Sequence, residues 1–128
     1  MTYTINRTFK GESFEDIDAR TRAALADSGF GVLTEIDVQA TMKKKLDAEM
    51  RPYRILGACN PKMAFEAIRM EPRVGAMLPC NVILREVDGG VEVSAIDPVA
   101  SMQAIDNDAL TDVAGQVRDL LAKAVEAI

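Results

Sequence analysis

The chain has 128 residues, a formal net charge of −5 and an isoelectric point near 4.7, with 48% hydrophobic and 27% charged residues. This is the composition and length of one globular domain spanning residues 1–128. Binding to nucleic acid needs several positive groups on one face, and the only basic cluster is Lys43-Lys44-Lys45, so we expect no nucleic-acid partner. No apolar run approaches the roughly 18 residues of a membrane span and no secretory signal is present, so we expect a cytoplasmic protein without membrane contact.

The first part of the chain predicts strand, helix and strand. Residues 2–9 alternate apolar and polar side chains, which is typical of a half-buried strand. Ser13 provides the cap of a helix that Ser28-Gly29 ends. Residues 30–38 alternate again and predict a second strand.

The middle of the chain predicts two helices, a strand and a hairpin. Residues 39–50 carry a narrow apolar stripe on a charged helix, which we expect either to move or to act as a lid over the cysteine region. Residues 53–58 read as a buried strand and residues 61–70 as a short helix. Two further strands, 80–87 and 90–96, are joined by an Asp-Gly-Gly turn and therefore predict an antiparallel hairpin.

The end of the chain predicts the longest helix. Residues 99–105 suit one irregular helical turn, and residues 108–128 follow the 3.6-residue apolar period of a helix that covers a sheet face. The order β-α-β-α-β-α-β-β-α has too few strand-helix alternations for a doubly wound sheet. We therefore expect an α+β fold, a two-layer sandwich with a mixed β-sheet and helices packed mainly on one face.

Both cysteines stand in a repeated context, because Cys59-Asn60-Pro61 and Cys80-Asn81 each place asparagine after cysteine. Asn60 predicts a helix N-cap and Pro61 the first helical position, so Cys59 lies at a strand-to-helix turn. The positive end of a helix dipole there favours a thiolate or holds an anion. Cys80 falls at the start of a strand.

Several interpretations of these groups remain open. The cysteines either fill space as buried thiols, bind a soft metal such as Cu(I), or cycle between dithiol and disulfide. The two asparagines are caps or turn formers, or they orient a ligand. Asp97 is a turn residue before Pro98 or a carboxylate that moves protons beside a thiol. Met63, Met77 and Met102 are interpreted as core filler rather than thioether ligands.

The chain contains no histidine, which excludes the usual zinc sets and the imidazole-dependent catalytic triads within one chain. It also has neither a G-x-G-x-x-G motif nor a phosphate-binding loop. These observations favour binding over catalysis, although enzyme activity stays undecided and no cofactor is indicated.

Residues 55–61, ILGACNP, and residues 78–84, LPCNVIL, are followed by a Gly-Gly turn, by Asp97-Pro98 with Met102, and by a C-terminal helix. This pattern, which covers nearly the whole chain, resembles the bacterial and archaeal domain-of-unknown-function family 302. The resemblance implies a compact domain of helices and strands, often a homodimer, without an established activity. Apolar residues on both faces of several strands also hint at a dimer.

From these observations we expect a homodimeric binding module. Its site for a small ligand, an anion or a soft metal lies at the helix start of Cys59, Asn60 and Pro61, near Cys80, with Asn81 and Asp97 as further candidates. One alternative is a thiol redox protein or enzyme with Cys59 as nucleophile and Cys80 as resolving thiol. The other is a structural or assembly domain with inert, buried cysteines.

Overall fold

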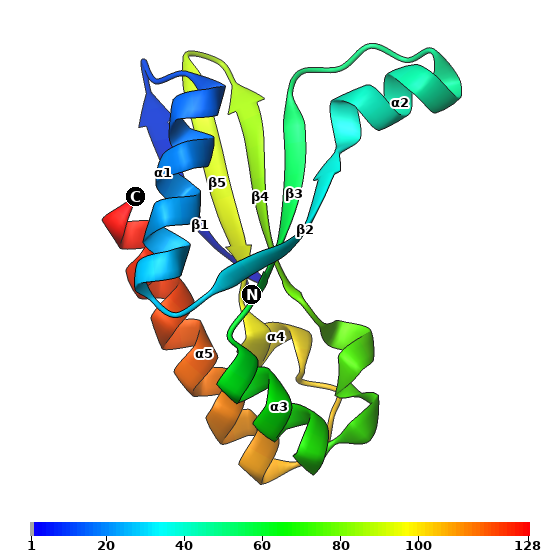
Figure 1. The fold of residues 1–128 in the computed structure, drawn as a ribbon, viewed down its shortest axis with the longest axis vertical. Helices are drawn as coiled ribbons and strands as arrows, with labels where there is room; N and C mark the ends of the chain where they lie inside the picture. The colour runs from blue at the N-terminus through cyan, green and yellow to red at the C-terminus, as the bar shows by residue number, and fades with distance from the viewer. Residues whose placement is uncertain (1) are drawn as a thin grey trace.

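A computed structural model describes residues 2–128 and contains one five-stranded sheet with helices against it (Figure 1). The order of the strands across the sheet is β1-β5-β4-β3-β2. Their bounds are β1 Thr4–Lys10, β2 Gly31–Asp37, β3 Tyr53–Cys59, β4 Cys80–Val87 and β5 Gly90–Ile96.

The α+β class and the order of the elements are confirmed, but the expected mixed sheet is wrong because every strand pair is antiparallel. The reason is the path of the connection between the first two strands. Helix α1, Phe14–Asp27, carries the chain from β1 at one edge of the sheet to β2 at the other edge. Strands β1 and β2 point the same way but never become neighbours, so no parallel pair forms.

The helices begin where short polar side chains can accept the free backbone donors of a first turn. The side chain of Ser13 accepts from the backbone N–H of Asp16 in α1, and Asn60 accepts from Met63 in α3, Pro61–Met70. Both caps were expected. Asn107 caps the long helix α5, Asp108–Ala127, in the same way.

Two short helical segments lie between the longer elements. A 3-10 helix, η1, follows α3 over Pro72–Met77, and a single turn, α4, spans Pro98–Ser101. Asp97 caps α4.

The core lies between one face of the sheet and helices α1 and α5. Strand β4 shows the pattern: Val82 and Leu84 are buried on the helix side, while Asn81 and Arg85 are exposed. The largest fully buried side chains come from both layers and include Ile17, Leu25, Leu56, Leu84, Leu110 and Leu121. We call this side of the sheet the covered face and the opposite side the open face.

An ion-pair cluster joins α1 to strands β2 and β3. Asp18 is 6% exposed and accepts hydrogen bonds from Arg22 Nε at 2.7 Å and from Arg54 Nη1 at 2.9 Å. Arg22 also pairs with Glu35 on β2, and Arg54 with Glu15 on α1. Because every charge in the cluster faces an opposite one, it fixes the helix against this edge of the sheet.

Helix α2, Val38–Leu46, buries none of its residues and extends away from the body of the protein, beside the start of β3 (Figure 1). The expected lid over the cysteine region is therefore wrong. Cys59 lies at the far end of β3, and a seven-residue strand is about 20 Å long, so α2 cannot reach it.

Within residues 2–128, no helix combines the length and the apolar character that crossing a membrane requires.

Candidate functional site

The end of the sheet where β3 stops and β4 starts holds both cysteines. Ala58 on β3 pairs with Cys80 on β4, so the two cysteines lie on adjacent strands. Asn60 Oδ1 accepts the backbone N–H of Met63 at 3.3 Å, and Pro61 occupies the first turn of α3. The strand-to-helix turn expected after Cys59 is present.

The two cysteines do not share one environment. Cys80 is 7% exposed and lines a small cavity on the covered face. Cys59 is half-buried, and because successive residues of a strand alternate, it turns away from the face that carries Ala58 and Cys80. A disulfide requires side chains that point toward each other. This arrangement does not favour a dithiol-disulfide pair.

Burial raises the pKa of the Cys80 thiol to about 11, and the nearby Cys59 adds to this effect. At neutral pH the Cys80 sulfur is therefore protonated. A poised thiolate nucleophile would require the opposite shift.

The remaining predicted residues are dispersed. Asp97 Oδ1 accepts the backbone N–H of Val99 at 2.9 Å, while Oδ2 accepts from Arg118 Nε at 3.0 Å, so its carboxylate is occupied by α4 and α5. Asn81 lies on the open face. The structure thus brings Cys59, Asn60 and Pro61 together. It places Cys80 inside the core, Asn81 on the open face and Asp97 against α4 and α5.

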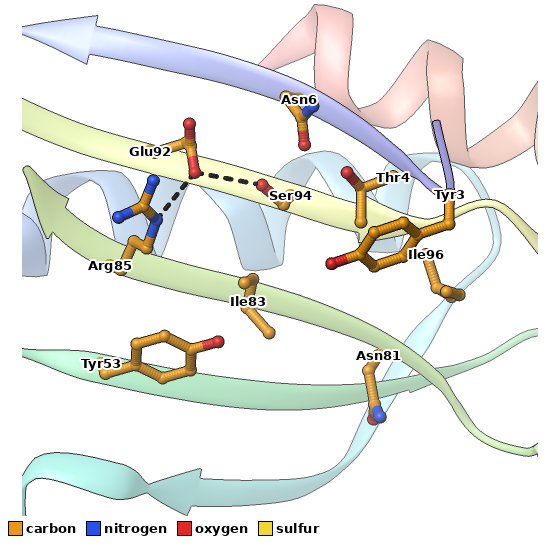
Figure 2. A pocket seen from close by; sticks show the side chains of 10 residues that line it. All are labelled: Tyr3, Thr4, Asn6, Tyr53, Asn81, Ile83, Arg85, Glu92, Ser94 and Ile96. Atoms are coloured by element: carbon orange, nitrogen blue, oxygen red, sulfur yellow. Dashed lines mark hydrogen bonds and ion pairs between the residues drawn. The ribbon is translucent and has the colours of Figure 1, made fainter. Parts of the chain in front are cut away.

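The open face of the sheet carries a trough of about 560 Å³. Within residues 2–128 no helix contributes to its lining, and Figure 2 shows side chains from β1, β3, β4 and β5, together with Tyr3, around it. The lining residues are Tyr3, Thr4, Asn6, Tyr53, Asn81, Ile83, Arg85, Glu92, Ser94 and Ile96.

The trough combines an apolar floor with aromatic and polar walls. The hydroxyl groups of Tyr3 and Tyr53 point inward on either side of Ile83 (Figure 2). Arg85 Nε donates to Glu92 Oε1 at 2.8 Å, and Ser94 Oγ donates to the same oxygen at 3.5 Å. Since Arg85 and Glu92 neutralise each other, the trough suits an uncharged ligand with polar groups at its edge.

A second hollow of about 470 Å³ adjoins the trough toward α2. The two share Tyr53 and Arg85 as lining residues, and the second reaches Met50 and Pro52. The concave surface therefore continues from the middle of the sheet to the segment that connects α2 to β3.

Sequence reasoning missed the trough except for Asn81. The available signal was the alternation within each strand, which assigns Tyr53, Ile83, Arg85 and Glu92 to faces. The sequence did not show which strands are neighbours in the sheet. It therefore could not show which side chains of different strands lie together in the trough.

The described chain, residues 2–128, contains no group of three or more histidine, cysteine, aspartate or glutamate residues placed to hold a metal ion.

Comparison with known proteins agrees with this fold. The family model described as "Domain of unknown function DUF302" matches residues 5–128. A crystal structure of an uncharacterized conserved DUF302 protein from Bacillus stearothermophilus superposes with a TM-score of 0.92 at 22% sequence identity, covering 99% of this chain and 98% of that one. No curated protein matches the chain.

Proposed function

The chain belongs to the DUF302 family, and from that premise we propose that it is a homodimeric binding module. Two copies pack through their open faces, and the trough holds a small, uncharged polar ligand that the second copy encloses. The observation that carries this proposal is the uncovered sheet face, which is hollowed and carries the partly exposed isoleucines Ile36, Ile55 and Ile83.

A row of three isoleucines runs across strands β2, β3 and β4 on the open face. Ile36 on β2 pairs with Ile55 on β3, which pairs with Ile83 on β4. Ile36 is 48% exposed, and Ile55 and Ile83 are only partly buried. An antiparallel sheet that faces water ordinarily carries polar residues at such positions, and contiguous exposed apolar surface favours an interaction site.

The charges of this face permit two copies to meet. The whole chain carries a net charge of −5, which opposes self-association. On the open face, however, Arg85 and Glu92 compensate each other within the trough. A two-fold interface brings the same patch of both copies together, so a neutral patch meets no repulsion.

The size of the face indicates a role for α2. Five strands about 4.8 Å apart and about 20 Å long cover roughly 500 Å². A stable interface buries about 800 Å² on each partner. Helix α2 extends beyond the sheet with Leu46 71% exposed, and we propose that it supplies the remaining contact with the second copy.

Sedimentation equilibrium tests the dimer. The matched variants are Ile83→Lys in the centre of the open face and Gln116→Lys on the exposed side of α5. Wild type and Gln116→Lys should dimerise alike, whereas Ile83→Lys should dimerise about tenfold or more weakly, because it buries an unpaired charge. A concentration-independent wild-type monomer would contradict the proposal.

Ligand binding is tested by titrating the ¹⁵N-labelled protein with a set of neutral aromatic and sugar-like fragments. Amide shifts should concentrate on β4 and β5 and disappear in Tyr53→Ala. Shifts confined to the helices would place the ligand elsewhere.

A second candidate is the helix start at Cys59, Asn60 and Pro61, which binds an anion or a soft ion. The half-buried Cys59 immediately precedes the N-cap of α3, where the helix dipole is positive. Sulfate titration monitored at the α3 amides tests it. The redox alternative is less favoured because Cys59 and Cys80 face different sides of the sheet.

A further inference from the structure

Three sulfur-bearing side chains line one small cavity on the covered face. The cavity measures about 30 Å³, and Met63, Cys80 and Met102 are among its lining residues. The other lining side chains are aliphatic and come from α3, α4, α5 and the segment before β4. It lies across the sheet from the trough and shares no lining residue with it.

Each of the three residues comes to the cavity from a different part of the chain. Cys80 is the first residue of β4 and faces the covered side. Met63 lies in the first turn of α3, directly after the Asn60 cap, and Met102 follows the short helix α4. Cys80 and Met102 are 7% and 8% exposed, so two of the three donors are already removed from water.

Water is a poor occupant of this cavity. A buried water molecule needs two to four polar partners, and the lining offers only a thiol and thioethers. The volume exceeds the roughly 10–15 Å³ that a single small occupant needs. The cavity therefore combines room for one small particle with donors that are soft rather than hydrogen-bonding.

In place of the interpretation of Met63 and Met102 as core filler, we propose that this cavity binds one soft monovalent metal ion, Cu(I), through the Cys80 thiolate and the thioether sulfurs of these two methionines. Soft thiolate and thioether ligands suit Cu(I), zinc and iron–sulfur clusters. Among these, a monovalent ion such as Cu(I) best fits a site with a single thiolate and two neutral thioethers. The site is separate from the proposed dimer and its ligand on the open face, and it does not depend on them.

The charge balance favours a monovalent ion. Binding follows Cys80–SH + Cu⁺ → Cys80–S–Cu + H⁺, in which the S–H bond breaks, the S–Cu bond forms, the proton leaves to solvent and no oxidation state changes. The product is neutral, which an apolar interior tolerates, whereas a divalent ion would leave a net positive charge buried without a partner.

An anaerobic competition titration against a coloured Cu(I) chelator tests the site. Wild type should bind one equivalent, and Cys80→Ser and Met102→Leu should bind about tenfold or more weakly. Met77→Leu is the matched control, because Met77 is 41% exposed and does not line the cavity. The proposal would be overturned if Cys80→Ser bound Cu(I) as tightly as wild type. It would also be overturned if Cys59→Ser lost Cu(I) binding while Cys80→Ser kept it.

A second measurement needs no substitution and so avoids variants that fail to fold. Wild-type protein labelled with ¹³C at the methionine methyl groups is titrated with Ag(I), which has the same charge and softness and no redox chemistry. The signals of Met63 and Met102 should shift together at one equivalent, while those of Met42 and Met50, which do not line the cavity, stay in place. Equal shifts at all four would indicate surface binding and overturn the proposal.

Discussion

The two faces of the sheet differ most clearly at neighbouring residues of β4. Leu84 is 0% exposed against the helices, whereas Ile83, one residue earlier, lies partly exposed in the floor of the trough. Both are aliphatic residues of similar size on the same strand. What separates them is only the layer that covers them, so the same side-chain chemistry stabilises the fold on one face and is available for binding on the other.

The largest change in stability should come from truncating the buried member of this pair, Leu84. Leu84→Ala should lower the free energy of unfolding by about 2–5 kcal/mol, because it leaves a cavity in a packed core. Ile83→Ala should cost less than about 1 kcal/mol per chain in dilute solution, because water already reaches the site. Urea denaturation of both variants at low protein concentration makes the comparison, and similar losses would contradict the distinction between the faces.

A second prediction concerns the open face at Gly57. A Cβ atom there would lie 2.7 Å from Pro79 Cγ and would also collide with Thr34 Oγ1. Gly57→Ala should therefore destabilise the protein by about 1–3 kcal/mol, since this part of the open face is packed closely.

The matched control for Gly57→Ala is Gly115→Ala in α5. A Cβ atom at Gly115 would have no neighbour within 4 Å, so this variant should be more stable by about 0.5–1 kcal/mol. Thermal unfolding distinguishes the two changes by their opposite signs. If both variants melted below wild type by the same amount, crowding at Gly57 would not be the cause.

The third prediction tests the cluster that holds α1 at the edge of the covered face. Burial raises the pKa of Asp18, but hydrogen bonds and charges from Arg22 and Arg54 outweigh it and hold that pKa below its ordinary value of 3.8. The unfolded state therefore binds the proton more readily, so this stability is present above pH about 4 and is lost as the pH falls further.

Asp18→Asn should cost about 1–3 kcal/mol at neutral pH. The difference from wild type should shrink in acid, as urea denaturation between pH 2 and 7 would record. Glu66→Gln, at an exposed position on α3, is the control. A difference that stayed constant across the whole range would contradict the ionic role.

The last prediction concerns the chemical reactivity of the two thiols and involves no change in stability. With the pKa of Cys80 raised to about 11, little thiolate exists at pH 8, and the thiol is also buried. Cys80 should be alkylated about 100-fold more slowly than a free cysteine at that pH. Its rate should increase with pH up to about pH 11.

Cys59, which is half-buried at the strand end, should react first. Mass spectrometry of the two peptides measures both rates in the native protein. Equal rates at both cysteines would contradict their placement on different sides of the sheet.

The candidate site was predictable where it depended on neighbours in the chain. Asn60 as the cap of α3, with Pro61 after it, follows from residues within one helical turn. The sequence did not predict that Cys59 and Cys80 lie on opposite faces of the sheet. Their placement depends on the strand register, in which Cys80 pairs with Ala58 and not with Cys59. A shift of the pairing by one residue would have reversed that relation.

By itself, the sequence determined the α+β class, the identity of most helices and strands, and the caps of two helices, Ser13 and Asn60. These depend on local periodicity and on side chains that hydrogen-bond to the adjacent backbone. Only the tertiary structure decided that β1 joins the sheet beside β5, that every strand pair is antiparallel, and that the helices among residues 2–128 leave one face uncovered. Those features depend on pairing between segments far apart in the chain, and it is the burial gained across the whole sheet that selects among such pairings.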